Sequence, residues 1–454
     1  MSLARQIVTS TRAVAFEQLP KEVVEKVKVC CLDFLSAAYE SLDLPWSRQA
    51  LGIVGRGHGS AAIAGSSVRV PAGDAAFVNG ILGHGLVRED MHTGSVSHLG
   101  VVVFPTLMAL SHEAPVSGRD LITAAVCGYE VSAQIGRALM VPDNVRQYRP
   151  TGICGPPGAA LAGAQMLGCD EGATVSALAF GANVAAGLNE WPYSGGDDMF
   201  FHVGFAARNA VMSAQLAQAG ATCSETSLDG TAGLFRALGS QERVGQVKPF
   251  ASGYEILSVF HKPAPACNYA QTAAQAADAL SGDLKQRGLS TSDITSIRVR
   301  CTDAAIAYPG CNHAGPFQKT LQAKMSIHYC VAATLLRGEI AEANYRMLDN
   351  PEIARLASCT TLEPDDDLTA AYPSQQGSEV ILTLRDGSTL ARRLPNVIPA
   401  TPADIRARFL RAAEPVIGRD AAQDLGTLID ELESEPRAER LANLAALSRE
   451  AVVT

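Results

Sequence analysis

The sequence predicts a mainly α protein in which a large all-helical domain, built from both chain ends, carries a smaller inserted α/β lid domain. Apolar residues recur near the helical period throughout the first half of the chain. Strand-like alternation is confined to residues 294–394, and helical patterning returns from 401 to 453. A chain of 454 residues is long enough for two or three domains. We place the helical domain at 1–265 and 398–454 and the lid domain at 266–397.

Helices are expected to follow one another in the N-terminal half. Five segments have apolar residues near the helical period or are rich in closely spaced alanine and glycine: 21–39, 118–140, 156–167, 173–188 and 205–219. Small side chains let helices approach closely, so these segments predict a compact bundle with many buried helices. Gly168 and Gly220 stand where two of the helices should end.

The lid is expected to contain a small sheet. Residues 294–302 alternate in the manner of a strand, and 379–394 is typical of a hairpin whose turn is the Arg-Asp-Gly-Ser sequence at 385–388. A helical segment at 323–336 lies between them, after a loop at 308–316 that glycine and proline residues mark. Strands and helices that alternate in this way predict an α/β unit.

The charge of the chain excludes some classes of partner. Lysine and arginine number 37 and aspartate and glutamate 46, which gives a formal net charge of −9. A protein that coats nucleic acid or an anionic membrane needs a concentrated positive surface, so we expect neither partner. A small anionic ligand stays possible, since net charge does not reveal a local basic pocket.

The eleven cysteines favour a reducing compartment. They are scattered, odd in number and without a Cys-x-x-Cys pair, and most stand beside alanine, valine or leucine, as buried core residues do. The first 17 residues contain no apolar run of signal-peptide length. The longest apolar stretch, 99–110, is too short to span a bilayer. We therefore expect a cytoplasmic protein.

Residues 84–98 form the segment richest in chemistry. Within fifteen residues it gathers three histidines, an arginine and two carboxylates: His84, Arg88, Glu89, Asp90, His92 and His98. Such polar density before an apolar helix is typical of a pocket. Alternatively, Glu89 and Asp90 only cap a helix end and His84 is a core histidine. His84 and His92 are eight residues apart, unlike the spacing of a helical zinc pair, so we predict no metal site.

Two further segments carry candidate cations. Tyr148, Arg149 and Thr151 precede a glycine- and proline-marked helix start, where free backbone N–H groups favour an anion and Arg149 adds a bidentate grip. A tight packing turn is the alternative. Lys262 stands between His261 and a proline, in a chain without any lysine from residue 29 to 247. It is either a binding cation at the domain change or a surface lysine in a linker.

A weaker candidate precedes one of the predicted helices. His202 comes just before an alanine-rich segment, where it either caps the helix or faces the cavity.

Together these segments resemble the MmgE/PrpD family, which includes 2-methylcitrate dehydratase, cis-aconitate decarboxylase and iminodisuccinate epimerase. The resemblance covers nearly the whole chain and is carried by 84–98, 118–130, 149–152, 202–208, 228–234, 262–267 and 323–326. It implies a helical domain formed by both chain ends, an α/β lid, a site in the cleft between them and a homodimer.

Carried over residue by residue, the resemblance is incomplete. The residues that match the family's motifs are Asp90, His98 and Lys262. The sequence departs from those motifs at Val87, Glu89, Arg149, Met199 and Cys267. The family's motif has aspartates at the positions of Val87 and Glu89. Glu89 keeps the negative charge of the aspartate that it replaces, whereas Val87 does not. The charge pattern of the decarboxylase branch is therefore broken.

Family reactions remove a proton α to a carboxylate, which needs a base, cations for the developing charge and an acid for any leaving hydroxyl. We expect His98 to be the base, because imidazole titrates near neutral pH. Asp90 would orient a histidine or share the proton transfer, and Tyr148 would be the acid. The expected substrate-binding residues are Arg88, His92, Arg149, Thr151, His202 and Cys267, with Lys262 as a further carboxylate grip.

The sequence thus predicts a lyase that dehydrates a small hydroxy-polycarboxylate resembling 2-methylcitrate. The alternatives are an epimerase or isomerase that removes and returns a proton, and an inactive homologue that binds a carboxylate. Nucleotide fingerprints, pyridoxal-lysine contexts and iron–sulfur cysteine sets are missing from the sequence, so we expect catalysis without a cofactor.

Overall fold

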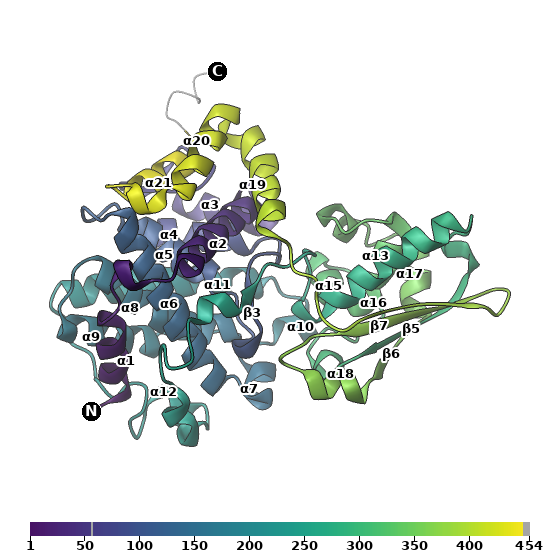
Figure 1. Ribbon diagram of the computed structural model, residues 1–454, viewed down its shortest axis with the longest axis horizontal. Helices are drawn as coiled ribbons and strands as arrows, with labels where there is room; N and C mark the ends of the chain where they lie inside the picture. The colour runs from purple at the N-terminus through teal and green to yellow at the C-terminus, as the bar shows by residue number, and fades with distance from the viewer. Residues whose placement is uncertain (56–57, 448–454) are drawn as a thin grey trace.

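The computed structural model, which describes residues 1–55 and 58–447, has a large helical part and a smaller α/β part side by side (Figure 1). The predicted mainly α fold class is confirmed. The helical part contains α1 (Leu3–Arg12), α2 (Lys21–Glu40), α3 (Pro45–Val54), α4 (Ala72–His84), α5 (Gly100–Leu110), α6 (Gly118–Leu139), α7 (Pro142–Gln147), α8 (Pro150–Met166), α9 (Glu171–Asn183), α10 (Trp191–Ser194), α11 (Asp198–Gln218) and α12 (Leu234–Ala237). Its C-terminal helices are α19 (Pro402–Ile417), α20 (Arg419–Asp430) and α21 (Glu439–Ala445).

The middle of the helical part consists of α4, α5, α6, α8 and α11, which pack on one another. α8 is buried along almost its entire length because small residues line it. A Cβ atom added at Gly158 would lie 2.1 Å from the Ser132 Oγ atom of α6. The close helix approach that the small residues predict is therefore present, and a larger residue at position 158 would push these helices apart.

Two helices begin earlier than predicted, and both changes move candidate residues. α8 begins at Pro150 rather than Pro156, because a proline fits the first helical position. Thr151 therefore lies in the first turn of α8. α11 begins at Asp198, so His202 lies inside a helix and does not cap one. Burial of both helices in the bundle outweighs the local breaker residues.

The chain returns to the helical part at its C-terminal end, where α19 packs on α2. Lys28 of α2 donates to the backbone oxygen of Asp430, 2.7 Å away, and pairs with Glu433. The structure confirms the predicted helical patterning up to residue 445; residues 448–453 of that prediction lie outside the described residues.

The α/β part has a four-stranded sheet with the order β6-β5-β7-β8. Its strands are β5 (Ile294–Cys301), β6 (Thr360–Pro364), β7 (Ser378–Leu384) and β8 (Thr389–Leu394). β5 pairs parallel with β6 and antiparallel with β7, and β7–β8 is the predicted hairpin. Strand β6 was not predicted, because its sequence, Thr-Thr-Leu-Glu-Pro, has no alternation of apolar and polar residues.

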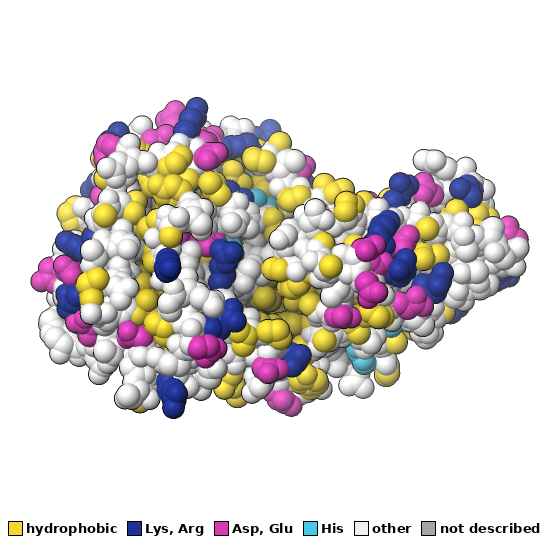
Figure 2. Space-filling model, turned by 60° about the horizontal axis from the view of Figure 1, so that its bottom comes forward, with side chains coloured by type: hydrophobic (Ala, Val, Ile, Leu, Met, Phe, Trp, Pro, Cys, Tyr) yellow, Lys and Arg dark blue, Asp and Glu magenta, His cyan; other side chains and the backbone are white. Residues whose placement is uncertain are grey.

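Helices cover one face of this sheet. They include α13 (Gln271–Gln286) and α17 (Pro351–Ser358), with α16 (Ile327–Arg337) packed on both; the remaining helices are α14 (Asp303–Ala307), α15 (Thr320–Met325) and α18 (Asp366–Ala371). The solvent side carries ion pairs, among them Arg300 and Arg393 with Asp365. Figure 2 shows acidic and basic side chains next to one another on the surface of this part. Alternating burial along β7 fits a sheet with one covered and one solvated face.

The chain crosses between the two parts at two neighbouring places. The Ala400 N–H on the returning segment donates to the His261 carbonyl oxygen on the outgoing one, 2.9 Å away. Arg408 of α19 donates to the carbonyl oxygens of Lys262 and Pro263. These bonds fix the outgoing segment to the helical part. The predicted boundaries at 265 and 397 stay predictions.

The helical part also contains strands of only two residues, and they do not build a sheet-based core. β1 (Ala61–Ala62) pairs with β2 (Arg69–Val70), and β3 (Met91–His92) pairs with β4 (Val259–Phe260). The β3–β4 pair ties the histidine-rich segment to the chain that enters the α/β part. Among the described helices, none has the length and apolar character that a membrane crossing needs.

Candidate active site

The loop between α4 and α5 is held at its start by two buried lysines, one on the segment that leaves the helical part and one in the α/β part. Lys262 Nζ donates to the Val87 carbonyl oxygen, and Lys324 Nζ of α15 donates to the Leu86 carbonyl oxygen, 2.9 Å away. Lys324 also pairs with Glu342. Val87 has a φ of 58°, in the left-handed region that β-branched residues rarely adopt. The two ammonium groups hold this unfavourable turn in place.

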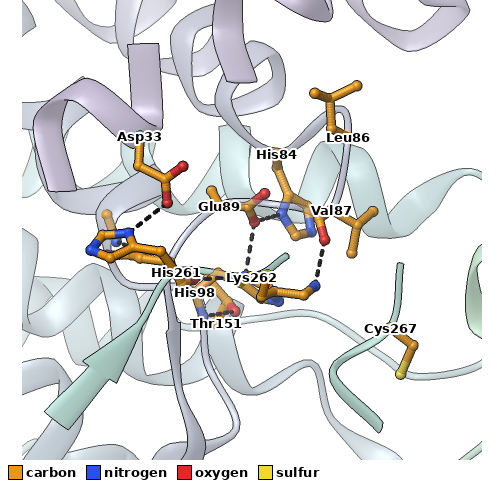
Figure 3. Close-up of polar contacts among 12 residues, drawn as sticks. Asp33, His84, Leu86, Val87, Glu89, His98, Thr151, His261, Lys262 and Cys267 are labelled. Atoms are coloured by element: carbon orange, nitrogen blue, oxygen red, sulfur yellow. Dashed lines mark hydrogen bonds and ion pairs between the residues drawn. The ribbon is translucent and has the colours of Figure 1, made fainter. Parts of the chain in front are cut away.

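The turn delivers Glu89 into a cluster with two histidines. Its Oε1 atom contacts His84 Nδ1 and lies 2.9 Å from His98 Nδ1 (Figure 3). All three side chains are almost fully buried. Arg149 donates to His84 Nε2 across 2.9 Å. Because a guanidinium only donates, His84 Nε2 accepts, and the His84 proton sits on Nδ1, facing Glu89.

His98 is oriented in the same way. Its Nδ1 faces two acceptors, Glu89 Oε1 and the Asp90 carbonyl oxygen at 3.0 Å, so it carries the ring proton. The Nε2 lone pair is thereby left available. Burial lowers the pKa of His98 to about 3, with Lys262 and His84 adding to the effect against the pull of Glu89. His98 is therefore neutral near pH 7.

Glu89 stays ionised beside these rings. Burial acts to raise the pKa of Glu89, but His84 and His98 together hold it well below its usual value. Its second oxygen, Oε2, is buried without a hydrogen-bond partner. A carboxylate that fixes the tautomer of a neighbouring imidazole is a known way to prepare a general base.

His98 lines a cavity of about 20 Å³, which is room for one water molecule. Tyr269 and Tyr308 of the α/β part line this cavity and also line a wider, mostly apolar pocket of about 210 Å³. The two spaces therefore meet at these rings. A substrate has to displace side chains to reach His98 from the wider pocket.

The structure brings five of the predicted residues together. His98, Arg149 and Cys267 line the small cavity. Thr151 Oγ1 accepts from the His98 backbone N–H at 3.0 Å, which fixes the base from the first turn of α8. Lys262 lies behind Val87, which also lines the cavity. Burial lowers the pKa of Lys262 to about 8, and nearby Glu89 opposes that effect.

Three predicted binding residues lie elsewhere. Arg88 turns toward α2, where it pairs with Glu40 at 2.8 Å. His92 bonds to Glu255 at 2.9 Å in a separate polar cluster. His202 is half-buried on α11 with its Nδ1 unpartnered, and it does not line the cavity. The prediction that these side chains would converge on one pocket is not supported by their positions.

Asp90 and Tyr148 also lie differently from the prediction. The Asp90 carboxylate accepts from the Tyr129 hydroxyl and from the Gly100 N–H at 3.2 Å, at the start of α5. It contacts His98 only through its backbone carbonyl. Burial raises the pKa of Asp90 to about 6. Tyr148 is half-buried and is not among the residues that line the cavity; its backbone pairs with that of Leu188.

Sequence reasoning missed three residues of this site. Glu89, not Asp90, orients the histidines. Tyr308 presents a second tyrosine to the cavity, and Lys324 holds Leu86. Glu89 is the other carboxylate that the sequence has in 84–98, but the direction of its side chain depends on the turn at Val87. Lys324 stood in a family motif, yet its contact with Leu86 spans 238 residues and leaves no local signal.

The same cluster has the donor types of a metal site. One ligand atom each from His84, Glu89 and His98 lies within 4.8 Å of the others. This set was not predicted from the sequence, because only the spacing of His84 and His92 was compared with that of a zinc pair. Both His84 ring nitrogens are already bonded, and the cations of Arg149 and Lys262 lie beside the cluster. Two positive charges oppose a further cation, so these residues fit a metal poorly.

Activity is therefore expected to survive chelation. Dialysis against EDTA should leave the turnover rate unchanged within error, since the positive charges beside His98 come from side chains. The check is a rate measurement before and after dialysis, with metal content recorded. A loss of turnover that a divalent ion restores would show that the cluster holds a metal.

Comparisons with known proteins match both parts of the chain. The MmgE/PrpD N-terminal domain matches residues 5–246, and the MmgE/PrpD C-terminal domain matches residues 264–434. A cis-aconitate decarboxylase-like protein of Aspergillus oryzae is 25% identical over 95% of this chain and 94% of its own length. Cis-aconitate decarboxylase of Mus musculus is 26% identical over 80% of this chain and 76% of its own length. The 2-methylcitrate dehydratase of Cupriavidus necator is 33% identical, but over 28% of this chain and 27% of its own length.

Proposed function

Because the chain belongs to the MmgE/PrpD family, we propose that it is a cofactor-independent lyase that dehydrates a small hydroxycarboxylate by removing the proton α to a carboxylate. The observation that carries this proposal is the state of His98. Its Nδ1 proton is fixed by Glu89 and Asp90, so the neutral ring offers Nε2 as a base at the cavity. Similarity to decarboxylases and dehydratases of polycarboxylates supports the same class of chemistry.

The proposed reaction breaks a C–H bond and a C–O bond. His98 Nε2 takes the α proton, and the electron pair of the C–H bond moves into the carboxylate, which becomes an aci-carboxylate. Arg149 and Lys262 stabilise that negative charge. The electrons then form the alkene as hydroxide leaves, and a proton from Tyr308 converts it to water. Burial raises the pKa of Tyr308, so its hydroxyl is protonated and able to donate.

The product decides between this proposal and its alternatives. Incubation with a panel of small hydroxycarboxylates should give an alkene that absorbs in the near ultraviolet, together with one water per turnover. Loss of optical rotation without an alkene would identify an epimerase. Binding by calorimetry without any turnover would identify an inactive carboxylate-binding homologue. Either result would overturn the dehydration.

We expect deprotonation of Lys262 to limit the activity at high pH. Its pKa of about 8 means that the ammonium loses its proton above that pH and no longer stabilises the developing charge. We expect kcat/KM to fall above pH 8, whereas His98 stays neutral down to about pH 3 and gives no acid limb above it. The measurement is a pH–rate profile of the wild type and of Lys262→Arg.

The Lys262→Arg variant is the matched control, because a guanidinium keeps its charge throughout this range. Its basic limb should move upward or disappear. Lys262→Met should raise KM and lower kcat at every pH, since the charge and the bond to Val87 are both lost. An unchanged basic limb in Lys262→Arg would assign that limb to another group.

We also propose a cytoplasmic homodimer. All eleven cysteines are free, which suits a reducing compartment. Phe205, Met212 and Leu216 stand seven and four residues apart on α11 and are 50%, 47% and 43% exposed. An exposed apolar stripe of this kind is typical of an interface between copies.

A charge on that stripe should separate the copies. Met212→Glu is expected to convert a dimer to a monomer in light scattering at micromolar concentration. Ile398→Glu is the control, because Ile398 is 59% exposed but lies far along the chain from α11. A wild-type monomer, or a Met212→Glu protein of unchanged mass, would contradict the dimer through α11.

A further inference from the structure

The charged side chains around His98 leave a small positive surplus. Arg149 and Lys262 each carry one positive charge there, and Glu89 carries the one negative charge. The other buried cations nearby have carboxylate partners of their own: Lys324 pairs with Glu342, and Arg88 pairs with Glu40. When the Asp90 carboxylate is left out, because it bonds to Tyr129 and to the start of α5, the described residues at this site have a surplus of one positive charge.

Of the two cations, Arg149 is the one that lines the cavity. Its guanidinium donates to His84 through Nη2, and its Nε is buried without a hydrogen-bond partner. A buried donor without a partner is costly, so an acceptor on a bound ligand would stabilise it. A carboxylate is the acceptor that best fits a guanidinium.

Most of the rest of the wall is apolar, and its described residues include no further charged side chain. Its apolar lining residues are Val87, Met91, Val96, Trp191, Met199 and Met325, and those with a polar atom are Cys267, Asn268, Tyr269 and Tyr308. The three methionine side chains are flexible and adapt to ligands of different shape, which also lets a nearly closed cavity widen. An additional carboxylate placed against this wall would lose its water and find no cation beyond Arg149 among the described residues that line the small cavity. Arg146 lines the wider pocket, but it already pairs with Asp143.

We infer that the substrate carries one carboxylate into the cavity, gripped by Arg149, and an alkyl-like substituent that packs on the three methionines. This inference rests on the proposed function and narrows its substrate. Instead of the polycarboxylate that the sequence predicts, the substrate is a branched hydroxy acid that carries a single negative charge.

The test uses three acids of similar branched shape that have no hydroxyl group and so cannot be dehydrated: isovalerate, methylsuccinate and tricarballylate. They carry one, two and three carboxylates. Calorimetry should show that isovalerate binds best to the wild type, and that each added carboxylate weakens binding by about tenfold or more. Arg149→Gln should abolish isovalerate binding.

Variants at Met199 test the wall itself. Met199→Lys adds a cation to the lining and should shift the preference toward methylsuccinate, whereas Met199→Leu should leave the wild-type order unchanged. The wild-type order stands as a test even where Met199→Lys does not fold. Tightest binding of tricarballylate, or binding of none of the three acids, would overturn the inference.

These outcomes are separate from those of the proposed function. Binding in the expected order, without turnover of the matching hydroxy acids, would contradict the dehydratase and leave the substrate class standing. Dehydration of a tricarboxylate with strong binding of tricarballylate would contradict the substrate class alone.

Discussion

Replacement of His98 by glutamine is expected to lower kcat by about 10²–10⁴-fold with little change in KM. The ring is the base, and its Nε2 lone pair is used only when the proton is transferred. Substrate binding relies on other groups, mainly Arg149. Glutamine is close in size and keeps a polar side chain, so the cavity should be preserved. The measurement is steady-state kinetics on the hydroxycarboxylate that gives an alkene.

A matched control separates this effect from loss of structure. Thr151→Ser keeps the hydroxyl that accepts from the His98 backbone N–H, and it should retain most of the wild-type rate. Both variants should melt near the wild-type temperature. Parallel losses of stability and rate would instead mean that His98 only holds the loop together.

Glu89→Gln is the second change with a large expected effect. Its carboxylate binds the Nδ1 protons of both His84 and His98, and an amide cannot hold both in that orientation. The ring of His98 is then free to present the wrong nitrogen. Loss of the negative charge also leaves Arg149 and Lys262 uncompensated. We expect kcat to fall by up to about 10⁴-fold, the loss found when a carboxylate that orients a histidine is neutralised.

Asp90→Asn is the matched control for this prediction. Asp90 is the neighbouring buried carboxylate, but it bonds to Tyr129 and to the start of α5 rather than to a histidine side chain. The variant should lose thermal stability and keep a rate within about tenfold of the wild type. A rate for Asp90→Asn below that of Glu89→Gln would return the orienting role to Asp90.

The combined His98 and Glu89 variant tests whether the two act as a unit. If Glu89 works only through His98, the double variant should be little slower than His98→Gln alone. Additive losses would mean that Glu89 has a separate part in the reaction, such as direct contact with the substrate.

Local patterns predicted most of the fold because most of its elements are periodic. The hairpin of β7 and β8 follows from alternation and an Asp-Gly turn, and α2 follows from its apolar spacing. The start of α8 could not be predicted in the same way. The local sequence around Pro156 predicts a helix start there, whereas burial against α6 keeps α8 intact through this proline.

The sequence predicts which types of residue form the site, but not the directions in which their side chains point. His98, Arg149 and Lys262 were found because histidines and rare cations are conspicuous in the sequence. The structure places the carboxylate of Glu89, rather than that of Asp90, against the two histidines, because the side chains of these adjacent residues point in different directions. These directions depend on the left-handed backbone at Val87, which Lys262 supports from 175 residues away.

The most direct test of the account is exchange of the α proton in heavy water. The wild type should incorporate deuterium at the α carbon of recovered substrate or lose that proton on forming the alkene, as mass spectrometry would show. His98→Gln, folded and still able to bind isovalerate, should show neither. Exchange by His98→Gln at the wild-type rate would contradict the claim that His98 is the base.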